Sequence, residues 1–272
     1  MDMWIKVLYD MSANMILPTT AAFAIAAIGL NVHFGFTGLL NMGQAGFMLI
    51  GAYGFAIATI AGFPFWAATL VTIGCGTLFA LLLGIPTLKL RGDYLAIVTI
   101  AAAEIVRMVG RASVLNDITG GSNGLAGEQF RNTFSELSPM PDGQTTIDNT
   151  GVNGWFIRIV AWSLVVIFAV LVWLLMRSPW GRVIKGIRED EDAVRSLGKN
   201  VFAFKMQSLI IGGVLGAIGG MFYILPTSLQ ADAMGRNMTF LIWTAMLLGG
   251  AATIWGPVLG SILFFALRIF IQ

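Results

Sequence analysis

The sequence is poor in charge, and it has almost no cysteine or histidine. Charged residues make up 11% of its 272 residues, whereas a soluble globular domain carries about 25%. The single cysteine, Cys75, excludes an internal disulfide framework and a cysteine cluster for a metal. The single histidine, His33, excludes a histidine pair, so we expect no metal site and no catalytic centre.

Two sequence motifs are also missing. No stretch has the form GxxxxGK[ST], so we expect the chain neither to hydrolyse ATP itself nor to bind any other cofactor. The first residues (MDMWIKVLYD) lack a basic region, an apolar core and a small-residue cleavage site. We therefore expect no cleaved signal peptide, and the first span should direct membrane insertion.

Long apolar runs dominate the sequence instead. Hydrophobic residues make up 57% of the chain, and the mean hydropathy is +0.82. Runs of roughly 20 apolar residues with few charges are typical of transmembrane helices. We predict an all-α polytopic membrane protein, with a single transmembrane domain over residues 1–272. About eight hydrophobic segments are expected, at about 16–34, 39–61, 65–85, 94–109, 155–176, 206–225, 238–254 and 257–271.

Glycine is unusually frequent, with 33 residues. Gly212, Gly216 and Gly220 follow one another at spacings of four in one segment, and Gly256 and Gly260 repeat the spacing in another. Small residues at this spacing let membrane helices approach closely. The glycines therefore predict tight helix packing, with a hinge role as the alternative.

The segment at about 39–61 is too polar and too rich in glycine for an ordinary span. It contains Asn41 and Gln44, with Gly35 and Gly38 just before it. Non-helical backbone at membrane depth is tolerated only where protein or a water-filled cavity satisfies it. We therefore expect a broken or re-entrant segment, whose amides either line a solute path or join helices by hydrogen bonds.

Two polar stretches set the expected orientation. Residues 177–205 hold seven of the sixteen basic residues, which predicts a cytoplasmic loop, and Lys89 and Arg91 should lie on the same side. Residues 110–154 hold five acidic and two basic residues, which is consistent with an extracytoplasmic loop. The side of the N-terminus stays open, because a re-entrant segment at 39–61 would change the count of crossings.

Glu104 and Arg107 are ionisable residues near membrane depth. Their spacing of three places them on one helix face, where they can form an ion pair. Buried charge in a membrane normally faces protein or a polar path. The two residues therefore form either a structural pair or part of a gate for a charged or zwitterionic solute.

Five stretches of the chain match one known family in the family's order, namely GFTGLLNMGQAGFMLIGAYG (35–54), LRGDYLAIVTIAAAEIVR (90–107), TGGSNGL (119–125), SPWGRVIKGIREDEDAVRSLGKNV (178–201) and LLGGAATIWGPVLGS (247–261). Through these stretches nearly the whole chain resembles the LivM-type permease subunits of bacterial branched-chain amino acid ABC transporters. Two features depart from the family's pattern. The loop at 110–154 is long, and Asn41-Met42-Gly43 stands where the family often has Ser-Leu-Gly.

The resemblance implies the permease fold of an ABC importer in the bacterial cytoplasmic membrane. It implies branched-chain amino acids as solutes, with urea, short amides or other amino acids as alternatives. Its expected partners are a second related permease, two cytoplasmic ATPase subunits that bind ATP and Mg²⁺, an extracytoplasmic solute-binding protein and membrane lipid, but no nucleic acid. The candidate solute path comprises Asn41, Gln44, Tyr94, Thr99, Glu104 and Arg107.

The resemblance also assigns a role to the cytoplasmic loop at 177–205. ABC importers present a short helix to the ATPase, often with an acidic-Ala-Ala…Gly pattern, of which Asp192-Ala193-Val194 and Gly198 are a loose version. We predict this coupling helix at about 189–197, ended by Gly198 and Asn200. The residues expected to couple to the ATPase are Arg182, Arg188, Glu189, Asp190, Glu191, Asp192, Ala193 and Gly198.

A self-sufficient secondary transporter or channel is the competing class. Such a protein needs several intramembrane ionisable residues for ion coupling, and this sequence offers essentially one pair, Glu104 and Arg107. The sequence therefore favours a permease driven by partner subunits.

Overall fold

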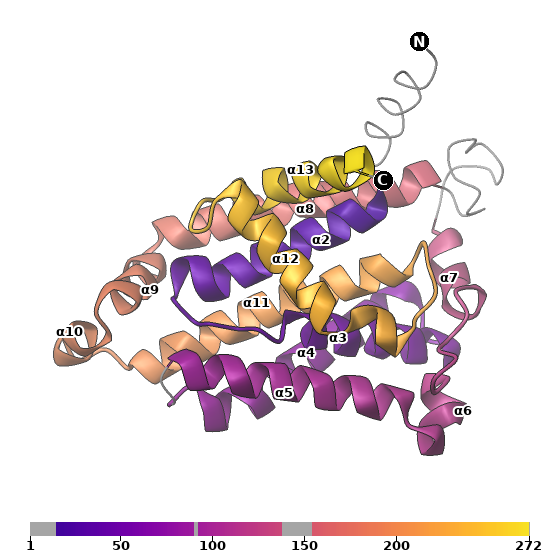
Figure 1. Cartoon of the computed structure of the whole chain (residues 1–272), viewed down its shortest axis with the longest axis horizontal. Helices are drawn as coiled ribbons and strands as arrows, with labels where there is room; N and C mark the ends of the chain where they lie inside the picture. Colours follow the sequence, from indigo (N-terminus) through magenta and orange to yellow (C-terminus); the bar gives the residue numbers. More distant parts are fainter. Residues whose placement is uncertain (1–14, 90–91, 138–153, 272) are drawn as a thin grey trace, which may run out of the picture.

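The computed structural model describes residues 15–89, 92–137 and 154–271, and it is helical (Figure 1). Each of the eight predicted segments contains a helix, so the all-α polytopic fold is confirmed. In order they are α2 (Pro18–Leu30) with the π-helix η1 (Asn31–Phe36), α3 (Gln44–Ile60), α4 (Phe65–Thr87), α5 (Gly92–Arg111), α8 (Gly154–Arg177), α11 (Val201–Ile224), α12 (Arg236–Gly249) and α13 (Gly256–Ile271).

The helices differ in their ability to cross a membrane unaided. Four of the described helices are long and apolar enough, namely Pro18–Phe36, Phe65–Thr87, Trp155–Arg177 and Val201–Ile224. Helices α3 and α13 are apolar but shorter, and α12 has 14 residues. A helix of that length spans about 21 Å, less than the ~30 Å hydrocarbon core. The short helices must therefore rely on their neighbours and on non-helical connections.

Helix α2 lies at the centre of the bundle. Its most apolar window is 89% buried, whereas the corresponding windows of α4 and α8 are 33% and 28% buried. Helix α11 packs against α2, α3 and α4, while α8 and α13 lie along α2 on another side (Figure 1). The most enclosed helix is thus near the start of the chain, and the peripheral helices α4 and α8 present apolar side chains to the membrane.

The glycines of α11 allow this packing. A Cβ atom at Gly212 would collide with the carbonyl oxygen of Gly29 in α2, and one at Gly220 would collide with the carbonyl oxygen of Met48 in α3. Gly260 in α13 is similarly pressed against the carbonyl oxygen of Ala245 in α12. The prediction of tight helix packing at these glycines is confirmed.

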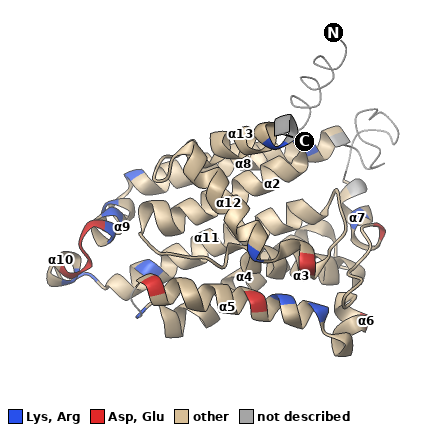
Figure 2. Ribbon diagram, viewed as in Figure 1, with Lys and Arg blue, Asp and Glu red and all other residues tan. Residues whose placement is uncertain are grey.

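The two polar stretches lie at opposite ends of the bundle (Figures 1 and 2). One end carries α9 (Pro179–Glu189) and α10 (Glu191–Ser196), which come from the stretch 177–205. The other carries η2 (Ser113–Leu115), α6 (Asn116–Thr119), α7 (Glu128–Ser135) and η3 (Ala231–Met234), with Leu125 and Leu229 paired through their backbones. Which end faces the cytoplasm stays a prediction. Arg91 and residues 138–153 of the predicted loop lie outside the described residues.

The glycine contacts generate a stability prediction. Replacing Gly220 with alanine should destabilise the bundle by about 1–3 kcal/mol, because the new methyl group must displace the backbone of α3. Gly74→Ala in α4 is the matched control, since a Cβ there meets nothing within 4 Å. The apparent melting temperature of the purified protein in detergent measures both effects, and equal values for the two variants would contradict the close approach.

Candidate functional site

A non-helical segment at 38–43 interrupts the membrane domain between η1 and α3. The predicted irregularity around Asn41 is therefore present, but it lies at the start of the 39–61 segment, since α3 runs without a break from Gln44 to Ile60, and re-entry stays a prediction. The backbone donors of residues 38–43 find partners without a helix: Leu39 N donates to His33 O at 2.8 Å, and Gly43 N donates to the side-chain oxygen of Asn41 at 2.8 Å. We call residues 38–43 the unwound segment.

Three fully buried polar side chains, from Asn41, Gln44 and His33, surround the unwound segment. Asn41 Nδ2 donates to Gln44 Oε1 at 3.0 Å and to His33 Nδ1 at 3.0 Å. His33 Nε2 donates to the carbonyl oxygen of Leu209 at 3.1 Å, because a carbonyl only accepts. The histidine is therefore the neutral tautomer with its proton on Nε2.

Gln44 completes this polar cluster. Its Nε2 donates to the carbonyl oxygens of Ala26 at 3.2 Å and Gly212 at 3.3 Å. The amide of Asn41 is oriented by Gly43, whose backbone N–H can only donate. The cluster of His33, Asn41 and Gln44 consequently joins α2, α3 and α11 with every named donor matched to an acceptor.

Helices α5 and α12 also hold the unwound segment. Met42 N donates to Thr99 Oγ1 at 3.0 Å, and Trp243 Nε1 donates to Asn41 O at 3.1 Å. One residue into α3, Ala45 N donates to Thr239 Oγ1 at 3.0 Å. The unwound segment is thus connected to helices from both halves of the chain.

The candidate path residues fall into separate places. Asn41, Gln44 and Thr99 meet around the unwound segment, where Asn41 and Gln44 make the interhelical hydrogen bonds of the alternative interpretation. Tyr94 stands apart on α5 with 62% of its surface exposed. The role of these residues in a solute path stays a prediction.

Glu104 and Arg107 form the expected ion pair, and it belongs to a larger network. Arg107 Nε donates to Glu104 Oε1 at 2.9 Å, and Arg107 also pairs with Asp232 of η3. Arg111 lies 3.3 Å from Asp232, and Arg236 lies 3.9 Å from Glu104. This network fastens α5 to the start of α12 at the end of the bundle remote from α9 and α10.

At the opposite end, α9 and α10 form a helical hairpin with Asp190 at its corner. The carboxylate of Asp190 accepts hydrogen bonds from Asp192 N and Ala193 N, both at 3.0 Å, and so caps α10. Gly198, with φ of +76°, lies just past the end of α10 in the left-handed conformation that glycine favours. We call residues 179–196 the α9–α10 hairpin.

The boundaries predicted for the coupling helix need correction. Helix α10 covers Glu191–Ser196, whereas Glu189 is the last residue of α9, because the chain turns at Asp190 to place its capping carboxylate. Asn200 does not terminate α10. Its side chain accepts from Ala203 N at 3.1 Å and starts α11 instead.

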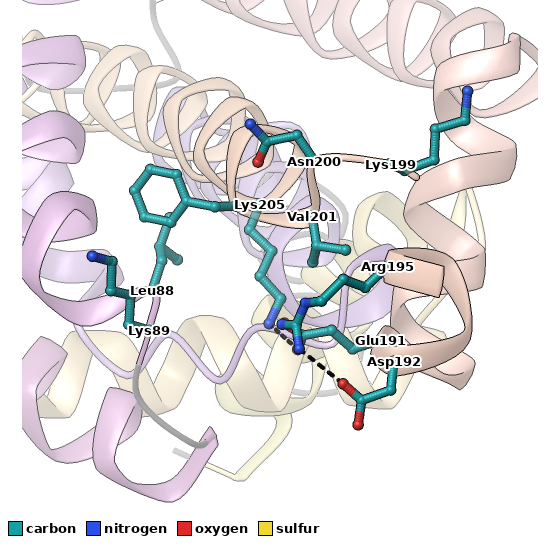
Figure 3. Close-up of a pocket in the computed structure, with 10 residues that line it drawn as sticks. Leu88, Lys89, Glu191, Asp192, Arg195, Lys199, Asn200, Val201 and Lys205 are labelled. Atoms are coloured by element: carbon teal, nitrogen blue, oxygen red, sulfur yellow. Dashed lines mark hydrogen bonds and ion pairs between the residues drawn. The ribbon is translucent and has the colours of Figure 1, made fainter. Parts of the chain in front are cut away.

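A cavity of about 590 Å³ lies where α10 meets the ends of α4 and α11 (Figure 3). Glu191 lines this cavity and forms two ion pairs there, with Arg195 at 2.9 Å and with Lys205 of α11. Arg195 also pairs with Asp192 at 2.9 Å. The remaining lining residues are Leu88, Lys89, Lys199, Asn200, Val201 and Phe202.

The outward surface of the hairpin is open. Arg182, Glu189 and Ala193 are exposed, and Leu197, just after α10, is 78% exposed. Arg188 is exposed as well, but its guanidinium also donates to the carbonyl oxygen of Gly35. The sequence analysis did not identify Asp232, Thr239 and Trp243 as bonding partners of α5, α3 and the unwound segment. These residues are distant in sequence, and no local spacing relates them to α3 or α5.

The apolar helices, interrupted before α3 and ended by a capped polar hairpin, define a multi-pass membrane domain. Residues 12–272 match the family described as branched-chain amino acid transport system / permease component. The chain belongs to this family of membrane permease subunits.

Several proteins of known assignment are similar to the chain. The high-affinity branched-chain amino acid transport system permease protein LivM of Escherichia coli K12 is 33% identical over 266 residues, covering 90% of this chain and 60% of the relative. The probable LivM of Methanocaldococcus jannaschii is 27% identical, covering 95% of this chain and 81% of the relative. The nucleoside ABC transporter permease NupC of Lactococcus lactis is 26% identical, covering 93% and 78%. No solved structure matches the chain.

The buried polar cluster generates the second prediction. Asn41→Leu should markedly lower the melting temperature, because it leaves Gln44 Oε1, His33 Nδ1 and Gly43 N without partners, at about 1–3 kcal/mol each. Asn132→Leu, the same change at an exposed position of α7, should leave it nearly unchanged. Thermal unfolding of both variants in detergent compares them, and a small shift for Asn41→Leu would show that the cluster is dispensable.

Proposed function

We propose that this chain is the permease subunit of an ATP-binding-cassette importer for branched-chain amino acids. Its membership of the permease family over residues 12–272 carries the proposal. The chain spans 60% of the length of the Escherichia coli relative, so the activity of the whole transporter is part of the proposal. A second related permease completes the translocation path, and an extracytoplasmic binding protein delivers the solute.

The energy for transport comes from two partner ATPase subunits that bind ATP and Mg²⁺, while this chain binds no cofactor. The α9–α10 hairpin supports this role, because it projects from one end of the bundle and presents exposed side chains on a capped helix. We infer that the ATPases bind this hairpin through Arg182, Glu189, Asp190, Asp192 and Ala193. Glu191 supports this role indirectly, because its ion pair with Lys205 holds α10 against α11.

The solute path runs along the unwound segment and α5. The residues that we propose to line it as the helices move are Asn41, Gln44, Tyr94, Thr99, Glu104 and Arg107. Asn41 and Gln44 are fully buried, so a path through the polar cluster would have to open before solute could pass. Opening would require the hydrogen bonds of this cluster to exchange for contacts with the solute or with water.

Branched-chain amino acids are favoured by the names of the relatives, of which LivM of Escherichia coli is 33% identical. A nucleoside permease is also related, at 26% identity. Urea and short amides remain the alternative solutes. A stand-alone secondary transporter is disfavoured, because Glu104 and Arg107, the ionisable pair that it would need for ion coupling, are paired in a network with η3 and α12.

A substitution on α10 tests the partner assignment. Ala193→Arg should abolish recovery of ATPase subunits from membranes in mild detergent, since it adds bulk to the exposed face without breaking the pairs of Glu191. Ser113→Arg introduces the same residue at the other end of the bundle and should leave recovery unchanged. ATPase binding by Ala193→Arg at the normal level would remove the hairpin from the interface.

Uptake measurements test the solute. Liposomes containing the complete transporter and its binding protein should accumulate radiolabelled leucine only when ATP is present on the side of the membrane that the α9–α10 hairpin faces. Excess isoleucine or valine should reduce this accumulation about tenfold, whereas urea and guanosine should not. Competition by urea or guanosine alone would redirect the solute assignment, and ATP-independent uptake driven by an ion gradient would favour the secondary-transporter class.

A further inference from the structure

Arg188 joins the α9–α10 hairpin to the interrupted span at the centre of the bundle. It is the penultimate residue of α9, two positions before the Asp190 cap of α10. Its Nη1 donates a hydrogen bond to the carbonyl oxygen of Gly35 in the last turn of η1. The two residues are 153 positions apart in sequence, so the fold creates this contact.

The carbonyl of Gly35 is a suitable acceptor because the helix stops there. Helix η1 ends at Phe36, and the last carbonyl groups of a helix have no partners within it. The partial negative charge at a helix C-terminus favours a cation, and a guanidinium forms stronger hydrogen bonds than a neutral donor. Arg188 therefore acts as a charged cap for η1, supplied by a different helix.

The aliphatic part of Arg188 makes a second contact, with Gly38 at the start of the unwound segment. Gly38 has a φ of +77°, and a Cβ atom there would lie 3.3 Å from Cγ of Arg188 and 3.7 Å from its Cα. The missing side chain at Gly38 lets the arginine stem lie directly against the backbone. Arg188 thus contacts the chain on both sides of the point where the helix ends.

Movement of the unwound segment would reach several spans. Three residues after Gly38, the carbonyl of Asn41 accepts a bond from Trp243 of α12, and the next backbone N–H donates to Thr99 of α5. Asn41 itself is bonded to His33 and Gln44. The hairpin also packs on the bundle through buried Ile184 and Ile187, but these apolar contacts carry no directional bond to η1.

We propose that Arg188 is the positioning residue that transmits displacement of the α9–α10 hairpin to the unwound segment, and through it to α5 and α12. The hydrogen bond to Gly35 and the contact with Gly38 make the hairpin and the end of η1 move together. This inference rests on the proposed function, which supplies the ATPase subunits that displace the hairpin.

The experiment compares solute uptake with ATP hydrolysis for the reconstituted transporter. Arg188→Met keeps an apolar stem but removes every donor, so uptake per ATP hydrolysed should fall about tenfold, the factor that corresponds to ~1.4 kcal/mol. ATPase subunits should still be recovered with the variant. Lys185→Met is the matched control on an exposed position of α9 and should keep the wild-type ratio. Arg188→Lys should restore part of the ratio, because an ammonium group can also donate to Gly35 O.

Three results would overturn the link. One is an unchanged ratio in Arg188→Met, and another is an equal fall in Lys185→Met. The third is loss of ATPase subunits from Arg188→Met, which would place Arg188 at the partner interface instead. If the Arg188→Met permease does not fold, Arg188→Leu, which also lacks a donor, is read by the same criteria. A wild-type transporter without ATP-driven uptake would overturn the proposed function as well. If the wild type and Arg188→Met take up the same amount of solute per ATP hydrolysed, only the proposed role of Arg188 is overturned.

Discussion

Backbone polar groups inside a membrane must be hydrogen-bonded within the protein, and this constraint governs the centre of the molecule. Residues 38–43 are non-helical between η1 and α3 and so cannot form the hydrogen bonds of a helix. Their partners come from Asn41, Thr99 and Trp243 and from the carbonyl of His33. The position of the unwound segment therefore depends on α5 and α12, and those helices are held by it in return.

Close packing of helices makes this arrangement feasible. Glycines at the contacts of α2, α3 and α11 bring the backbones near enough for one glutamine, Gln44, to bond carbonyls of two helices. A side chain at Gly29 would press on Gly212 O and on Gln44 itself. Small residues and polar bonds consequently act together, because apolar burial alone contributes little to helix association in lipid.

Local sequence signals predicted features that depend on few residues. The eight apolar segments, the break before α3 and the pairing of Glu104 with Arg107 follow from hydropathy, glycine content and helical spacing. The short helix predicted at about 189–197 is α10 (Glu191–Ser196), which starts two residues later and ends one residue earlier, because the acidic run from Glu189 to Asp192 offers several capping positions. Only the turn at Asp190 selects one of them. Asn200 was assigned to the end of α10 although its side chain caps α11, since asparagine suits both helix ends.

The amino-acid sequence was enough to predict the class of the protein, because repeated apolar runs of about 20 residues with little charge are typical of membrane spans and a charged stretch between them must reach water. It also determined that the span around Asn41 would be irregular, since glycines and amides disfavour a lipid-facing helix. The tertiary structure alone decided which groups satisfy that irregular backbone. Trp243 bonds this backbone, and Thr239 and Arg188 bond the helix ends on either side of it. All three are far from it in sequence, and their contacts exist only because the helices pack in one arrangement.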